Sequence, residues 1–215
     1  MNQVSNRELS FLKANWDNFL YAVSVVDPEE QEYKLILQNY QEPQRGYHNL
    51  KHIQETLSDF EDVKEMLQNP LEVQMAIWYH DIIYDSTKQD NEEVSARIAL
   101  NAAQKFGLGD SFGKRVHDLI IVTKGHLPSD NPDSRYLIDI DFGILGKDES
   151  RFDEYEQGIR KEYSQYPDKM YNYGRAEILK GFLERDFLYQ TDYFREKYEA
   201  NARKNLQKVI EILQK

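Results

Sequence analysis

Histidines and aspartates set in apolar surroundings are the residues of this sequence best suited to metal chemistry. His80 and Asp81 are adjacent within residues 76–85, a segment that is otherwise mostly apolar or aromatic. Burying an imidazole and a carboxylate in such a segment is costly unless a partner compensates them. A divalent cation is one such partner, so this His-Asp pair is the first candidate for a metal site.

Other candidate ligands lie on both sides of this pair. His48 and His52 are four residues apart, which places them on one face if the segment is helical. Asp139 and Asp141 are both flanked by apolar residues. Imidazole and carboxylate together suit a divalent ion such as Mn, Mg, Fe, Ni, Co or Zn. The sequence has no cysteine, which excludes thiolate ligands, thiolate nucleophiles and disulfides.

Composition limits the class of protein. The chain has 215 residues, of which 40% are hydrophobic, and this suits one globular domain. Its formal charge of −11 argues against a broad nucleic-acid surface. Residues 1–8 are polar and lack a signal-peptide core, and no apolar run approaches the ~20 residues that span a bilayer. We therefore expect a cytoplasmic protein that contacts neither membrane nor nucleic acid.

Apolar residues recur at spacings of three and four along most of the chain, which predicts an all-α fold. Residues 137–142 also alternate with period two, as a strand would, but the absence of partner strands favours a helix there. The predicted helices cover residues 8–25, 29–39, 47–67, 71–84, 91–106, 111–123, 136–146, 152–163, 174–188 and 192–213.

The ordered set His52, His80-Asp81 and Asp141 resembles the H…HD…D signature of HD-domain metal-dependent phosphohydrolases. Residues 47–52 are also similar to the Tyr-His-Asn-x-x-His segment of cyclic-nucleotide phosphodiesterases, a distant branch of that superfamily. The closer likeness is to a group of small bacterial predicted phosphohydrolases. It extends through residues 90–96, 137–146, 159–163 and 174–175, and so covers nearly the whole chain.

This resemblance implies a fold and a set of ligands. The fold would be an HD-domain helical bundle with the metal site between its central helices. Residues 1–215 would form one domain, with the metal-site core at about 45–146 and the helices of 150–215 packed on it. The metal would be held by His52, His80, Asp81 and Asp141, since Asp141 matches the family segment better than Asp139 does.

Further roles follow from the chemistry of such a site. His48 would protonate the leaving oxygen, and Asp81 would orient the attacking water. Lys124 and His126, together with Arg45 and Arg175, would neutralise phosphate oxygens. The candidates for ligands of a second metal, or for partners of the first ligands, are Asp85, Glu92, Glu93 and Asp139. Tyr79 and Tyr84 flank the His-Asp pair and are expected to form pocket walls, with residues 163–173 as a lid or rim.

The expected function is hydrolysis of a phosphoester bond in a small nucleotide-like metabolite by metal-activated water. Two alternatives stay open: a non-catalytic HD-fold protein that binds a nucleotide or a partner protein, and an HD-fold di-iron oxygenase. The oxygenase would need extra ligands such as Asp85, Glu92, Glu93 and His126. The glutamine-plus-aromatic purine clamp of cyclic-nucleotide enzymes is not recognisable here. A homodimer is compatible with the sequence.

Overall fold

The computed structural model describes residues 5–215, and every regular element within that range is helical. Residues 1–4, part of the polar segment 1–8, lie outside this description. The α-helices are α1 (Asn6–Ala22), α2 (Gln31–Tyr40), α3 (Leu50–Val63), α4 (Pro70–Tyr79), α5 (Asn91–Lys105), α6 (Asp110–Thr123), α7 (Pro132–Asp141), α8 (Glu149–Glu162), α9 (Asp168–Leu183), α10 (Asp192–Phe194) and α11 (Ala200–Leu213). Short 3₁₀ turns form η1 (Lys64–Met66), η2 (Lys124–His126) and η3 (Phe142–Gly146), and η4 (Arg195–Glu199) is a π-helix.

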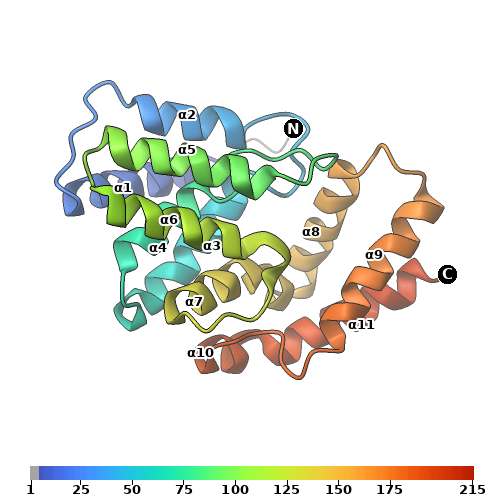
Figure 1. The fold of residues 1–215 in the computed structure, drawn as a ribbon. Helices are drawn as coiled ribbons and strands as arrows, with labels where there is room; N and C mark the ends of the chain where they lie inside the picture. The colour runs from blue at the N-terminus through green and yellow to red at the C-terminus, as the bar shows by residue number, and fades with distance from the viewer. Residues whose placement is uncertain (1–4) are drawn as a thin grey trace.

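Helix α4 is the centre of the bundle. Eight of its ten residues, from Glu72 to Tyr79, are buried. A helix that is apolar around its whole circumference must be covered on all sides. Helices α1, α3, α5, α6 and α7 all contact it (Figure 1). Trp16 of α1 meets Trp78 of α4 edge to face at 5.3 Å between ring centroids, which closes this part of the core.

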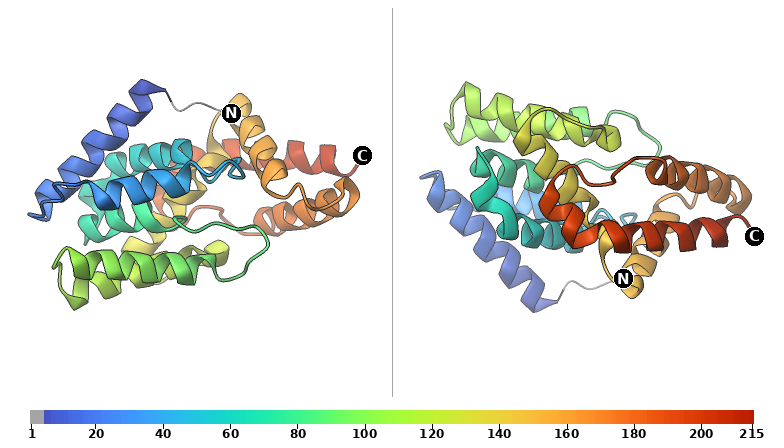
Figure 2. Two further views of the ribbon diagram at one scale, coloured as in Figure 1. Left: turned by 90° about the horizontal axis from the view of Figure 1, so that it is seen from above. Right: turned by 90° about the horizontal axis from the view of Figure 1, so that it is seen from below.

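The C-terminal helices extend the molecule away from this core. Helices α9 and α11 pack against each other at the end of the molecule opposite α1, and α8 lies between them and the core (Figures 1 and 2). The turn η3, which follows α7, contacts α3, α8 and α11. Residues shortly after the end of α7 therefore join the central bundle to the C-terminal helices.

The observed helix bounds explain why the candidate site lies where helices end. Asn49 is the N-cap of α3, its side chain accepting the Lys51 N–H, so α3 begins at Leu50. His48 therefore precedes the helix, and the prediction that His48 and His52 share one helical face is wrong. Helix α4 ends at Tyr79, so His80 and Asp81 follow it directly.

Elsewhere the all-helical prediction is confirmed. The segment that was open to a strand interpretation is α7 followed by η3. Asn131 caps α7 and Pro132 occupies its first turn, two strong helix-start signals. Helix α9 begins at Asp168, directly after Pro167, six residues before the predicted start at Gly174. Among residues 5–215 no helix combines the length and the apolar character that crossing a membrane requires.

Two long-range contacts fix the C-terminal half onto the core. The buried carboxylate of Asp139 accepts the backbone N–H groups of Gln190 and Thr191 and the Thr191 hydroxyl, at 2.7–3.0 Å. Gly46 and Gly158 touch backbone to backbone, and a Cβ on Gly158 would lie 2.9 Å from the carbonyl carbon of Gly46. The loop before α3 therefore lies directly on α8.

Asp139→Ala is expected to lower the free energy of unfolding by about 2–4 kcal/mol, because it leaves the Gln190 and Thr191 donors without their acceptor. Urea denaturation followed by circular dichroism measures the change. Asp186→Ala, at an exposed carboxylate, is the control and should differ from the parent chain by less than about 0.5 kcal/mol. Equal losses in the two variants would contradict the role given to Asp139.

Candidate metal centre

Four side chains meet where three helices begin or end. His52 lies in the first turn of α3, and Asp141 is the last residue of α7. His80 and Asp81 directly follow α4. Each of these three helices contacts the other two. Their packing therefore gathers side chains that are far apart in the sequence, and we call these four the ligand group.

The donor atoms of His52, His80 and Asp81 are close enough to share one cation, and Asp141 lies beside the two histidines. The Nε2 atoms of His52 and His80 are 3.0 Å apart. Asp81 Oδ2 lies 3.1 Å from His80 Nε2 and 3.6 Å from His52 Nε2. Asp141 Oδ1 lies 3.3 Å from His52 Nε2 and 3.6 Å from His80 Nε2. Ligand atoms held about 2.1 Å from an ion are about 3.0 Å apart in octahedral geometry and about 3.4 Å apart in tetrahedral geometry. His52, His80 and Asp81 could therefore bind a metal ion, and Asp141 lies within reach of the same position.

The histidine tautomers favour the same conclusion. His80 Nδ1 lies 2.8 Å from the carbonyl oxygen of Ile77, which can only accept, so Nδ1 carries the hydrogen. The Nε2 atom of neutral His80 then presents a lone pair to the ligand group. His52 Nε2 faces it in an interior where His52 and His80 are only 1% and 2% exposed. Two facing nitrogens and two carboxylates are stabilised by positive charge between them, which a divalent ion could supply.

Electrostatics keep the carboxylates ionised. Burial opposes ionisation of Asp81 and Asp141, but neighbouring histidines outweigh it and lower the pKa of both carboxyl groups. Burial lowers the pKa of His52, which favours the neutral imidazole that binds metals. His80 is also buried, yet the Asp81 and Asp141 carboxylates hold its pKa well above the usual range. Without an ion, a proton on His80 therefore compensates part of the negative charge.

Arg45 fixes the backbone of the His-Asp pair. Its guanidinium donates to the carbonyl oxygens of Asp81 and Ile82 at 2.6 and 2.8 Å, and to that of His48 at 3.1 Å. The side chain is fully enclosed, and Glu42 pairs with its Nε. The prediction that Arg45 neutralises a phosphate oxygen is therefore wrong in this structure, because its guanidinium is enclosed and holds the loop that carries Asp81.

His48 reaches the ligand group from the loop before α3. Its Nδ1 lies 2.8 Å from Glu162 Oε2, and its Nε2 lies 4.0 Å from Asp81 Oδ2. Glu162 Oε1 also accepts the backbone N–H groups of Gly46, Tyr47 and His48 at 2.8–2.9 Å. Burial lowers the pKa of His48, but Glu162 and Asp81 outweigh it and raise that pKa. The carboxylate of Glu162 therefore orients His48, with Nε2 toward the ligand group.

Glu162 is a site residue that was not predicted from the sequence. It lies at the end of α8, more than a hundred residues after His48, and nothing local marks it as different from other charged helical residues. Its inclusion in the resembling segment 159–163 was the one available signal.

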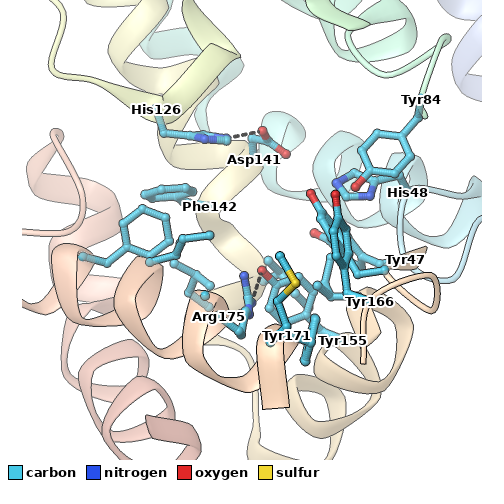
Figure 3. A pocket seen from close by; sticks show the side chains of 18 residues that line it. Tyr47, His48, Tyr84, His126, Asp141, Phe142, Tyr155, Tyr166, Tyr171 and Arg175 are labelled. Atoms are coloured by element: carbon cyan, nitrogen blue, oxygen red, sulfur yellow. Dashed lines mark hydrogen bonds and ion pairs between the residues drawn. The ribbon is translucent and has the colours of Figure 1, made fainter. Parts of the chain in front are cut away.

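His126 completes the wall beside Asp141. Its Nε2 lies 2.6 Å from Asp141 Oδ2, and its ring stacks on Phe142 at 4.3 Å (Figure 3). The backbone of His126 has a positive φ of 50° and follows Gly125 at 72°, so a left-handed turn aims the imidazole inward. Arg185 donates to the His126 carbonyl oxygen at 3.0 Å and supports this turn.

A cavity of about 510 Å³ opens beside the ligand group. Asp141, His48 and His126 lie on one side of it, and residues of α9 lie across from them (Figure 3). Tyr84 stacks on His48 at 3.9 Å and forms part of its wall. Tyr79 does not, because its ring is buried in the core and its hydroxyl donates to Glu32. The expected lid or rim also borders the cavity, through Tyr163, Tyr166, Met170 and Tyr171.

Several expected site residues lie elsewhere. Lys124 is half exposed and pairs with Glu93 and the Gln89 carbonyl oxygen instead of facing the cavity. Asp85 is exposed and caps the turn at Thr87. Within residues 5–215, neither Glu92 nor Glu93 joins the ligand group or the cavity wall.

Two more candidates are engaged in other contacts. Asp139 faces the backbone at Gln190 and Thr191, and so Asp141 is the aspartate that α7 presents to the histidines. Arg175 lines the cavity, but its guanidinium is paired with Glu156 and donates to the Tyr155 hydroxyl.

Comparison with known proteins identifies no relative: no family model, no curated protein and no solved structure matches this chain. The chemistry of the site must therefore be inferred from its own donor atoms, charges and cavity.

We expect one divalent ion per chain, and His80→Ala should weaken its binding at least about 100-fold because it removes a ligand from the group. The measurement is metal stoichiometry by mass spectrometry after stripping, reloading and dialysis, with affinity by calorimetry. His117→Ala, at a partly exposed histidine that pairs with Asp118, is the matched control and should bind as the parent does. Unchanged affinity in His80→Ala would refute the assignment of this ligand.

Proposed function

We propose that this protein is a metal-dependent phosphohydrolase that cleaves a phosphoester bond in a small molecule. The observation that supports the proposal most strongly is the convergence of His52, His80, Asp81 and Asp141 on one buried position at the edge of a cavity. The resemblance of these residues to the HD-domain signature agrees with it and suggests an HD-type bundle and a nucleotide-like substrate.

Each residue of the site would have a defined task. A divalent ion held by the ligand group would lower the pKa of a water molecule and offset the negative charge of the phosphate. Asp81 would orient the water, whose proton would pass to solvent as the water oxygen bonds to phosphorus. His48 would donate a proton from Nε2 to the ester oxygen as the P–O bond breaks, while Glu162 holds the imidazole in place.

The two alternatives predict different behaviour. A non-catalytic binding protein would take up metal and ligand without turnover. An oxygenase would require iron and further ligands, but Asp85 and Glu93 are engaged in other contacts, and Glu92 is not a member of the ligand group among residues 5–215. The extra donors next to the group are imidazoles, His126 beside Asp141 and His48 beside Asp81. The geometry therefore favours hydrolysis at a single ion.

Metal-stripped protein resupplied singly with Mn, Mg, Co, Ni, Zn or Fe should hydrolyse members of a phosphoester panel. Asp81→Ala should lose at least about 100-fold of that rate, because it removes both a ligand and the group that orients water. Release of inorganic phosphate, with and without a coupling phosphatase, distinguishes monoesters from diesters. Equal rates in the parent and Asp81→Ala, for every metal, would overturn the hydrolase proposal.

His48→Ala should lower kcat by about 10²–10⁴ for phenyl phosphate, whose leaving oxygen needs a proton. The loss should be much smaller for 4-nitrophenyl phosphate, because that leaving group departs as a stable anion. Glu162→Gln should change kcat in the same direction but less, since it loosens His48 without removing it. Bound metal, measured in parallel, should be unchanged in both variants. Equal losses for the two substrates would argue that His48 is not the proton donor.

A further inference from the structure

We propose that the substrate carries a single phosphate group on an uncharged aromatic body, and that the cavity beside the ligand group holds this body. This inference names the substrate class and rests on the proposed phosphohydrolase function. It draws on the composition of the cavity wall, the charges already paired within it and the character of its mouth.

The cavity wall is largely aromatic and aliphatic. Tyrosines contribute rings from five parts of the chain: the loop before α3, the segment after the His-Asp pair, α8, the stretch between α8 and α9, and the first turn of α9. They are Tyr47, Tyr84, Tyr155, Tyr163, Tyr166 and Tyr171. Phe142 lies beside His126 (Figure 3), and its ring contacts that of Phe182 at 5.1 Å between centroids. Flat rings of this kind offer stacking and edge contacts to another flat ring.

Positive charge in this wall is already neutralised. Arg175 is the one arginine or lysine among the lining residues, and Glu156 pairs with it at both Nε and Nη2. His126 is paired with Asp141, and His48 with Glu162. A di- or triphosphate needs several free cations to balance its charge. The wall offers none, so only one phosphate group, at the metal, can be accommodated without an unpaired charge.

The mouth of the cavity is apolar as well. Met170 and Ile178 of α9 line it, yet they are 62% and 53% exposed. Large apolar side chains at the entrance of a pocket favour a ligand with an apolar body. A cavity of about 510 Å³ falls within the range that encloses a small organic ligand.

Two glycines of α9 provide a matched pair of probes. Gly174 lines the cavity, whereas Gly181, two turns later on the same helix, does not. A Cβ at either position would meet no atom within 4 Å, so both tolerate a side chain. Replacing glycine within a helix also favours helix formation. Gly174→Phe should therefore fill the cavity without unfolding the helix, and Gly181→Phe should leave the cavity open.

The experiment compares two phosphonates that cannot be hydrolysed, 1-naphthylphosphonate and methylphosphonate. Calorimetry on metal-loaded protein should show 1-naphthylphosphonate binding about 10- to 100-fold more tightly, because its rings leave water. Gly174→Phe should abolish this preference while keeping the affinity for methylphosphonate. Gly181→Phe should retain it. Among substrates, 1-naphthyl phosphate should have a higher kcat/KM than glycerol phosphate or ATP.

Failure of this inference can be separated from failure of the proposed function. Turnover in which ATP or glycerol phosphate exceeds 1-naphthyl phosphate would overturn the aromatic-monophosphate assignment while leaving hydrolysis intact. Equal binding of the two phosphonates, or an equal effect of Gly174→Phe and Gly181→Phe, would overturn it too. A preference for 1-naphthylphosphonate that Gly174→Phe removes, without turnover of any ester, would support the aromatic site and refute the hydrolase.

Discussion

The rest of the structure depends on the electrostatic compensation of His52, His80, Asp81 and Asp141. Two carboxylates and two imidazoles lie together in an interior that offers them little water. Ions removed from water are stable in a protein only when other charges and hydrogen bonds replace the lost hydration. Two features of His80 meet this requirement. The Ile77 carbonyl oxygen accepts a hydrogen bond from His80 Nδ1, so the lone pair of Nε2 faces the group. When no ion is bound, the aspartates raise the pKa of His80 and favour its protonation. The three helices α3, α4 and α7 bring these groups together, and the buried apolar surface of α4 stabilises that arrangement.

Three charged side chains near this group hold the backbone segments around it. Arg45 holds the backbone after α4, Glu162 holds the loop before α3, and Arg185 supports the turn at His126. These residues contact the backbone of the segments that carry the candidate ligands and proton donors. Their charged groups form hydrogen bonds to backbone groups of the protein instead of facing the cavity. The cavity therefore combines a highly charged edge at the ligand group with largely aromatic walls.

The sequence predicted the helical content well because apolar periodicity and helix caps are local signals. It also indicated that His80 and Asp81 belong to a candidate metal site, since charged residues are easily recognised in an apolar segment. The sequence did not predict the position of a side chain where contacts with distant parts of the chain set that position. Arg45 and Arg175 resemble ordinary surface arginines, and only the fold shows that both are buried and paired. Between Asp139 and Asp141, the resemblance to the HD-domain segment favoured Asp141, which the structure places beside the histidines, while Asp139 accepts from the backbone at Thr191, a contact that the sequence did not indicate. His48 reaches the site from a loop that Glu162 anchors, whereas the sequence predicted a shared helical face.

The contact between Gly46 and Gly158 has a consequence for how this protein can vary. Each glycine leaves no room for a side chain on the other, because backbone atoms meet there. An ordinary side-chain contact can change in small steps, with one partner shrinking as the other grows. Neither glycine has a side chain that could become smaller, so a larger residue at one position cannot be compensated by a smaller residue at the other. The contact that holds the loop carrying His48 can therefore be retained or lost during evolution, but it cannot change through a series of small substitutions.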